Sequence, residues 1–172
     1  MCEIRLATPE DILLLPAIEL AAGQLFLQYE FTAALADDTT PVENFNEALK
    51  DNLLWVAAVS GGKPIGFALV FLLDGQAHLE ELAVRPDYGR QGIGAKLVQT
   101  VIEWARSCGI PAVTLTTFRD IPWNAPFYQK LGFRILEPTE LSPELLRMVE
   151  EEESRGLARK LRVVMQIETT AL

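Results

Sequence analysis

The chain has 172 residues, 49% of them apolar, and a net charge of −9. This length suits one domain with a single large core, so we expect one domain over 1–172 with its core at about 4–167. The negative charge argues against nucleic acid as the main partner, because binding a phosphate backbone needs a basic face. It favours an amine-bearing substrate, or it serves solubility alone. No apolar run approaches the roughly 20 residues that span a bilayer, so no membrane partner is expected.

Two cysteines, Cys2 and Cys108, are expected to be free thiols in a reducing compartment, and not a disulfide framework. The start of the chain lacks a basic segment followed by a long apolar one, so no signal peptide is expected. Both features predict a cytoplasmic protein. No group of His, Cys and Asp residues has the spacing of metal ligands, so no metal is expected.

The first half of the chain is expected to supply helices followed by antiparallel strands. Thr8, followed by Pro9 and Asp11, has the pattern of a helix start with Thr8 as the N-cap residue. Apolar runs separated by glycine turns are typical of hairpins. In chain order we expect a strand at 4–6, a helix from Thr8 to about Gly23, a loop near Pro41, a short helix over 44–50, and strands at 53–59, 65–73 and 78–84.

The second half alternates helices and strands. Apolar residues from Ile93 to Ala105 recur at helical spacing, and Gly109 ends that helix. A strand, a helix and another strand follow one another here, so a right-handed parallel crossover is the default. The acidic run over 150–153 is expected on the solvated face of a helix. The other expected elements are a strand at 112–118, a helix at 123–131, a strand at 133–136, a helix that Ser142 caps and that reaches about Arg155, and a strand at 161–167.

A glycine-rich loop lies between the strand that ends at Val84 and the helix that begins near Ile93. Such a loop aims several backbone N–H groups at one point in front of a positive helix end, which suits an anion such as a phosphate. A dinucleotide-binding fingerprint needs a third glycine where Leu97 stands. A nucleotide-binding P-loop needs a Ser or Thr after its lysine, but Leu97 follows Lys96. Both interpretations are disfavoured, and a loop that only starts a helix is the alternative.

The segment from Leu82 to Leu97 resembles the acyl-CoA-binding motif of the GNAT superfamily of N-acetyltransferases. The segment from Trp123 to Phe133 is similar to the superfamily's second motif, in which an Asn begins a helix, a Tyr follows and the helix ends in Gly-Phe. One helix and one strand separate the two motifs, as in the superfamily. The resemblance runs from Ile4 to about Ile167. It implies the GNAT-like acyl-CoA N-acyltransferase fold, an α/β (α+β) architecture with a mixed, mostly antiparallel central sheet of about six to seven strands flanked by helices.

The resemblance implies that acetyl-CoA is the co-substrate. The backbone of Leu82 and Val84 would pair with its pantetheine arm like an added strand, and the strands around Val84 and Val113 should splay apart there. Backbone amides of the loop would hold the pyrophosphate, and Asn124 would bind the pantetheine or place a water. The residues implied in co-substrate binding are Leu82, Ala83, Val84, Arg90, Gln91, Gly92, Ile93, Gly94, Ala95 and Asn124.

The loop departs from the superfamily pattern at one point. Gly89 stands where an Arg or Gln is common, and Arg90 stands one place later. The backbone cradle depends on Gly92 and Gly94 and is retained. Whether Arg85 or Arg90 helps to neutralise the pyrophosphate stays open.

Acetyl transfer to an amine needs a base and an acid. The amine is largely protonated at neutral pH and must lose a proton, and the departing thiolate must gain one. The resemblance places Tyr128 near the sulfur as the acid. On an extended strand His78 and Glu80 share one face, and Glu80 is the favoured base, directly or through water. His78 is the other candidate base, with a structural role as its alternative.

We therefore expect an acetyl-CoA-dependent N-acetyltransferase that acetylates a primary amine by direct attack in a ternary complex. The acceptor is left open between a small-molecule amine and a protein amine. Acetylation of a protein N-terminus or lysine is the rival activity. A catalytically inactive CoA-binding sensor or interaction module on the same fold is the rival from another class. A homodimer also stays open, because dimers are common in the superfamily although no sequence feature marks an interface.

Overall fold

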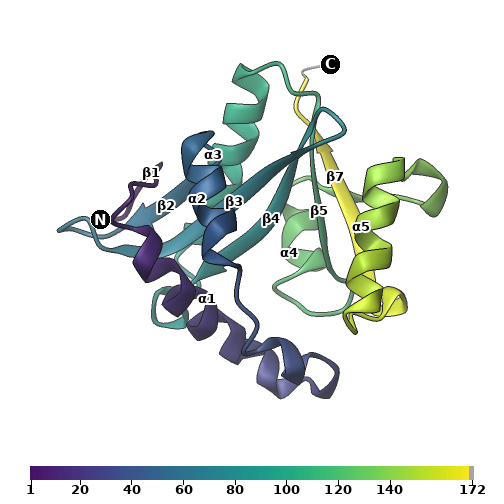
Figure 1. The fold of residues 1–172 in the computed structure, drawn as a ribbon, viewed down its shortest axis with the longest axis horizontal. Helices are drawn as coiled ribbons and strands as arrows, with labels where there is room; N and C mark the ends of the chain where they lie inside the picture. Colours follow the sequence, from purple (N-terminus) through teal and green to yellow (C-terminus); the bar gives the residue numbers. More distant parts are fainter. Residues whose placement is uncertain (171–172) are drawn as a thin grey trace. The chain divides into compact units, whose positions relative to one another are not determined.

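The computed structural model describes residues 1–170, apart from the side chains of residues 33–35 (Figure 1). Seven strands form a mixed sheet in the order β1-β2-β3-β4-β5-β7-β6. β4 and β5 pair in parallel, and the pairs β1–β2, β2–β3, β5–β7 and β6–β7 are antiparallel. The expected α/β class with a mostly antiparallel sheet is confirmed. The contacts divide the chain into two compact units, Met1–Val70 with Glu81–Val101 and Phe71–Glu80 with Ile102–Leu172.

The first unit has a core made by short apolar strands and one covering helix. All five residues of β2 are buried, because they are apolar on both faces. From α2, Phe45 packs edge-on against Phe67 of β3, with ring centroids 5.3 Å apart. Its elements are β1 (Glu3–Leu6), α1 (Leu15–Gly23), α2 (Val42–Lys50), β2 (Leu54–Ala58), most of β3 (Pro64–Leu73), the end of β4 (Gln76–Val84) and the start of α3 (Ile93–Ser107).

The predicted helix start at Thr8 is wrong. Residues 8–11 form a turn in which the Asp11 carboxylate accepts the Thr8 N–H at 2.8 Å and pairs with Arg5 at 2.7 Å. A 3₁₀ turn over Ile12–Leu14 follows, and α1 begins after it with Pro16 in its first turn. Proline has no N–H to donate to the carbonyl four residues earlier, so an α-helix begun at Thr8 could not run through Pro16 regularly.

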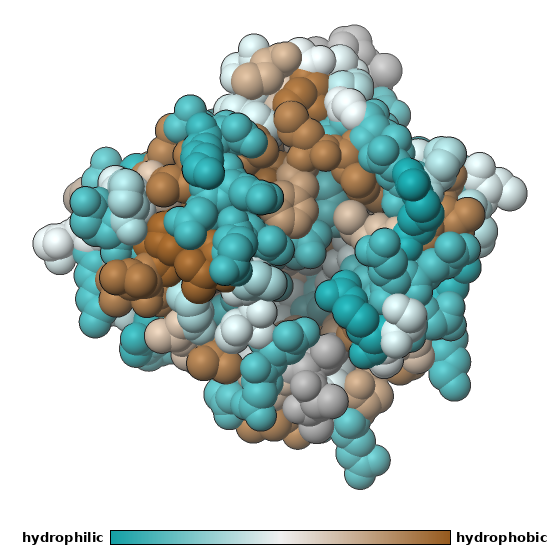
Figure 2. All heavy atoms as spheres, in the orientation of Figure 1, coloured by the Kyte–Doolittle hydropathy of each residue, from teal (hydrophilic) through white to brown (hydrophobic). Residues whose placement is uncertain are grey.

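Two short 3₁₀ helices that the sequence did not indicate follow α1, over Gln24–Gln28 and Glu30–Leu35. The short helix expected at 44–50 is present as α2. Apolar side chains reach the surface just before α1, where Leu13 is 83% exposed. Figure 2 shows apolar side chains at the surface of this part of the chain.

The second unit is built on β5 and β7, with α5 lying beside β7 (Figure 1). Ser142 caps α5 as predicted, because its Oγ accepts the Leu145 N–H at 3.2 Å. From α5, Leu145 and Val149 pack against Val164 of β7. Besides the end of β3, the start of β4 and the end of α3, its elements are β5 (Ala112–Phe118), α4 (Ala125–Lys130), β6 (Arg134–Ile135), α5 (Pro143–Ser154) and β7 (Arg162–Glu168). Within the described part of the chain, no helix has the length and apolarity to cross a membrane.

Candidate functional site

The glycine loop of the first unit is defined by its backbone conformation. Arg90 has φ 60° and Gly92 has φ 76°, whereas Gly89 is extended with φ −63°. The left-handed region disfavours an arginine, so the unusual position of this loop is Arg90. The displaced arginine therefore takes a conformation that glycine would adopt without strain.

Helix α3 begins directly after this loop. Its first turn is closed by the Lys96 N–H, which donates to the Gly92 carbonyl at 3.0 Å. The amides of Ile93, Gly94 and Ala95 precede that bond, and helix geometry gives them no acceptor inside the helix. A run of such amides at the positive end of a 15-residue helix is suited to hold an anion.

The two candidate arginines near the loop differ in what they contact. Arg85 binds Asp87 through two hydrogen bonds of 3.0 Å each, so its guanidinium already faces a carboxylate. Arg90 is exposed beside Gly92. Arg90 is thus the better placed of the two to meet a phosphate at the start of α3.

The end of β4 is held by β3. Ala83 is buried, and a Cβ added to Gly66 of β3 would stand 2.9 Å from the Ala83 carbonyl oxygen. The Arg85 N–H donates to the Ile65 carbonyl at 2.9 Å. These contacts fix the backbone over Leu82, Ala83 and Val84, which is the segment implied in pairing with the co-substrate.

In the second unit, β4 carries the two candidate bases. His78 is 1% exposed, and its Nδ1 lies 2.9 Å from Oγ1 of Thr114. Its Nε2 lies 3.7 Å from Oε2 of Glu80, whose side chain is 35% exposed. Burial, and secondarily the charge of Arg162, lower the pKa of His78 to about 4. At neutral pH His78 is therefore uncharged, and a proton on Nε2 would face the Glu80 carboxylate while Nδ1 accepts from Thr114.

The parallel pairing of β4 with β5 begins earlier than the sequence suggested. Ala77 is opposite Val113 and His78 is opposite Thr114. Val113 therefore lies in the paired part of the strands and does not mark the splay. The reason is register, since Val84 lies seven residues beyond Ala77. Within the described strands the pairing extends only over these two residue pairs, so a splay near Val84 stays a prediction.

The second motif begins at Asn124, which occupies the N-cap position of α4 without capping it. Its Oδ1 instead accepts hydrogen bonds from the Thr117 hydroxyl at 2.9 Å and the Phe118 N–H at 3.4 Å, which tie it to β5. Tyr128, one turn along α4, is buried between the rings of Phe127 and Phe133, with centroid distances of 5.0 and 5.7 Å. The structure thus brings Asn124 and Tyr128 together on α4, and His78 and Glu80 together on β4.

Sequence reasoning missed a partly buried polar cluster in the second unit, formed by Thr116, Glu152 and Arg162. Arg162 Nη2 lies 3.1 Å from the Glu152 carboxylate and 3.0 Å from Oγ1 of Thr116, and Thr116 donates to Glu152 at 2.5 Å. The Arg162 guanidinium also stacks over Phe118, 4.7 Å from the ring centroid.

Glu152 corrects the expectation that the whole run over 150–153 is solvated, because it is 8% exposed. The missed signal was helical spacing, since Leu145, Val149 and Glu152 recur on one face of α5. A charge on that face predicts a buried partner. Among residues 1–170, no three His, Cys, Asp or Glu side chains are grouped to hold a metal ion.

Comparison with known proteins adds independent findings. Residues 21–133 match the model of the acetyltransferase (GNAT) family. The chain is 31% identical over 99 residues to peptidyl-lysine N-acetyltransferase YjaB of Salmonella typhimurium, covering 58% of this chain and 62% of that protein. It is 31% identical over 133 residues to the probable N-acetyltransferase camello of Xenopus tropicalis, covering 74% of this chain and 60% of that protein. The chain thus spans less than two thirds of these relatives.

Among solved structures, the PaiA N-acetyltransferase of Thermoplasma acidophilum in complex with coenzyme A has a similar fold. The TM-score is 0.71 at 18% identity, and the alignment covers 98% of this chain and 99% of that one. At this identity the likeness concerns the fold alone.

Proposed function

The chain belongs to the GNAT family of acetyltransferases, and we propose from this premise that it transfers an acetyl group from acetyl-CoA to a primary amine. The observation that carries the proposal is the loop before α3, where left-handed Arg90 and Gly92 lead into the amides of the helix start. This arrangement fits the pyrophosphate of acetyl-CoA. We assign residues 4–167 to one acetyltransferase domain that acts in the cytoplasm, in keeping with the free thiols of Cys2 and Cys108.

The residues that would hold acetyl-CoA follow the order of the loop and strand. Amides of Arg90, Gln91, Gly92, Ile93, Gly94 and Ala95 would bind the pyrophosphate, with the Arg90 side chain nearby. The backbone over 82–84 would pair with the pantetheine arm, and the Val84 N–H would polarise the thioester carbonyl. Asn124 would place a water or bind the pantetheine.

The transfer then needs three proton movements. Glu80 would take a proton from the ammonium of the acceptor, directly or through water, and the freed amine nitrogen would bond to the thioester carbon. As the carbon–sulfur bond breaks, Tyr128 would donate its hydroxyl proton to the thiolate. The nitrogen would lose its second proton as the amide forms, and this proton would return to the Tyr128 oxygen through water. We give His78 a positioning role, because its lowered pKa makes its imidazole a weak base.

A protein lysine is the second candidate acceptor. The specific observation that favours it is the 31% identity to YjaB, whose name records a peptidyl-lysine substrate. A lysine-containing peptide and a set of small amines, each assayed for release of the CoA thiol, distinguish the two acceptors.

Calorimetry with acetyl-CoA, NADH and ATP tests the proposal at its first step. Binding of acetyl-CoA alone is expected, and binding of NADH or ATP without acetyl-CoA contradicts the assignment. Thiol release in the presence of an amine then tests transfer, and acetyl-CoA binding without release to any amine supports a sensor instead. Glu80→Gln should abolish the acidic limb of the pH–rate profile, and an unaltered profile removes Glu80 as the base.

A further inference from the structure

A cavity of about 390 Å³ lies within the second unit. It is formed by β5, β7, the last turns of α5, the segment that joins β6 to α5 and the 3₁₀ turn over Arg159–Leu161. This volume is within the range of pockets that hold small molecules, about 300–1,000 Å³. We call it the α5 cavity and define it by Thr116, Arg119, Glu152, Arg159 and Arg162, which line it together with mainly apolar neighbours.

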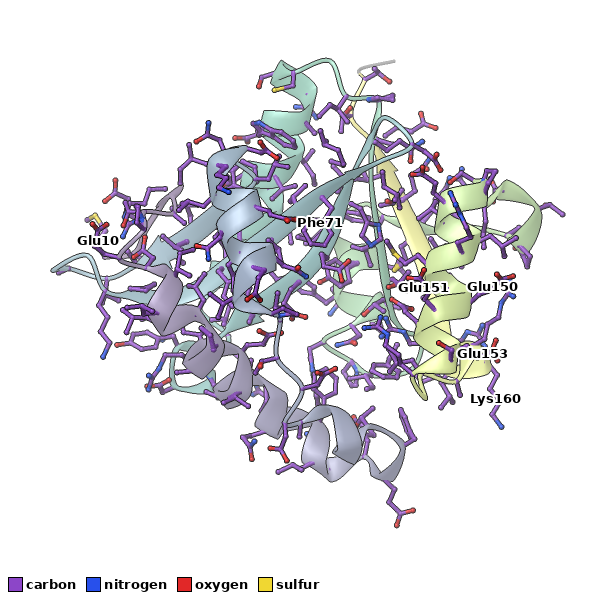
Figure 3. The ribbon with its side chains drawn as sticks, viewed as in Figure 1. Glu10, Phe71, Glu150, Glu151, Glu153 and Lys160 are labelled. Carbon is purple, nitrogen blue, oxygen red and sulfur yellow. The ribbon has the colours of Figure 1, made fainter. Side chains whose placement is uncertain are left out.

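The charge of the α5 cavity is opposite to that of the chain. Its lining contains four basic residues, Arg119, Arg159, Lys160 and Arg162, and two acidic ones, Glu137 and Glu152. The chain as a whole has a net charge of −9. Figure 3 shows Lys160 below α5, on the same part of the molecule as the exposed Glu150, Glu151 and Glu153. A local excess of positive charge in so acidic a protein favours an anionic ligand in this cavity.

Among the lining residues, Arg162 has a side chain that its neighbours hold in place. Glu152 and Thr116 hold its Nη2, and the Phe118 ring supports its plane. Its Nε is buried and has no hydrogen-bond partner, and within the described side chains it is the only buried nitrogen or oxygen in that state. An unpaired buried donor is costly, so this guanidinium keeps hydrogen-bonding capacity that Glu152 and Thr116 do not use.

The α5 cavity opens on the same strand face as the candidate base. Thr114, which contacts His78, and Thr116, which lines the cavity, are two residues apart on β5 and therefore share one face. The charge of Arg162 also reaches His78, since it lowers the pKa of that imidazole. An acceptor with a polar group at each end could thus have its amine near Glu80 and its other end at Arg162.

Resting on the proposed acetyl transfer, we infer that the α5 cavity binds an acidic group of the acceptor, a carboxylate or a phosphate, through Arg159 and Arg162. The acceptor class is then a small amine that also carries an acidic group. Guanidinium groups recognise both oxyanions with paired hydrogen bonds, so the same residues serve either one.

The first arm of the test compares matched acceptors. Alkylamines, ω-amino acids and aminoalkyl phosphates of equal chain length are assayed for thiol release. An acidic acceptor of the right length should have a kcat/KM at least about tenfold above its neutral analogue, as expected for one charged hydrogen bond. The carboxylate and phosphate series show which oxyanion the cavity prefers.

The second arm uses variants at the rim, because Arg162 variants can fail to fold. Arg159→Gln should raise the KM for the preferred acidic amine about tenfold, and Arg159→Lys should restore part of it. Arg155→Gln is the matched control, since Arg155 is an exposed arginine that ends α5 outside the cavity lining. Equal effects of Arg159→Gln and Arg155→Gln overturn the inference.

The third arm measures anion binding and does not depend on acetyl transfer. Inorganic phosphate and acetate are titrated while the Arg162 Nε–H signal is followed by NMR, and this signal should shift in the wild type. Anion binding without transfer to any amine contradicts the proposed function alone. Transfer to acidic and neutral amines at equal kcat/KM, with an unmoved Arg162 signal, overturns the anion site alone. The anion site is also overturned if a lysine peptide is the preferred acceptor and Arg159→Gln does not change that preference.

Discussion

The loop before α3 and the polar cluster under α5 each gather polar groups, but they are built in different ways. The loop is proposed as a backbone site, in which left-handed Arg90 and Gly92 lead into the amides at the start of α3. The cluster is a side-chain site, in which Thr116, Glu152 and Arg162 come from β5, α5 and β7. The first depends on local conformation, and the second depends on how distant segments pack.

This difference predicts different responses to substitution. A backbone site keeps most of its donors when one side chain is removed, because amides do not depend on residue type. A buried charged cluster destabilises the fold when one member is removed, because the remaining charge stays desolvated and has no partner. Substitutions in both units and a change of pH test the contrast, beginning with the largest expected effect.

Removing one charge of the cluster should have the largest effect. Glu152→Ala leaves Arg162 without its carboxylate in a site where the two side chains are 11% and 14% exposed. We expect the free energy of unfolding to fall by about 3–5 kcal/mol, measured by urea denaturation. Glu151→Ala, an exposed neighbour on the same helix, should change it by less than about 0.5 kcal/mol. Equal losses in the two variants would show that the pair with Arg162 does not stabilise the fold.

Acid should destabilise the second unit through His78. Its pKa is lowered to about 4 in the folded protein, whereas an unfolded histidine titrates near 6.5. The unfolded chain therefore binds the proton first, so the stabilisation is present above about pH 6.5 and is lost as the pH falls to about 4. The loss should be on the order of 3 kcal/mol, measured by urea denaturation across this range. His78→Gln should lack this component, and parallel profiles for the two proteins would contradict it.

The loop could be predicted from the sequence and the cluster could not, because the first depends on local conformation and the second on packing. The loop could be recognised because its residues are contiguous and glycines permit left-handed φ angles. The left-handed conformation of Arg90 was not predicted, since nothing in the sequence indicates it. The cluster could not be recognised, because residues 116, 152 and 162 meet only after β5 and β7 pair.

Local patterns also failed where they fit two structures equally well. Thr8, Pro9 and Asp11 suit a helix start, and they suit equally the turn that Asp11 closes. The acidic run over 150–153 hid the helical spacing that buries Glu152. The register of β4 on β5 could not be predicted from the sequence either, because two apolar strands can pair at several offsets. The strands and helices themselves were predicted well, since their apolar periodicity is strong.

Tyr128→Phe should separate catalysis from binding in the second unit. The Phe127 and Phe133 rings pack around Tyr128, and Phe keeps those contacts. Loss of the proton donor should lower kcat about 100-fold and leave the Kd for acetyl-CoA unchanged. Tyr88→Phe is the matched control, with kcat close to that of the wild type. An unchanged kcat in Tyr128→Phe removes Tyr128 as the acid.

The smallest effects are expected in the loop, and they should differ in sign. Gly92→Ala puts a Cβ on a residue with φ 76°, where no atom stands within 4 Å of it, so any loss comes from conformation alone. We expect about 1 kcal/mol of lost stability by urea denaturation. Arg90→Gly relieves the left-handed strain, which is worth roughly 1–2 kcal/mol. The greater conformational freedom of glycine in the unfolded chain offsets roughly 0.5–1 kcal/mol of this, so a small gain in stability is expected.

Acetyl-CoA binding by the same two variants decides whether the loop is a backbone site. If amides hold the pyrophosphate, Arg90→Gly should weaken binding by less than about fivefold, and salt should reduce even that difference because the guanidinium is exposed. Gly92→Ala should weaken binding at least as much, although it removes no charge, because it disturbs the φ angle that aims the amides. A loss of 100-fold or more in Arg90→Gly, with Gly92→Ala near the wild type, would make the arginine side chain the main ligand. The loop would then depend on one residue, as the cluster under α5 does.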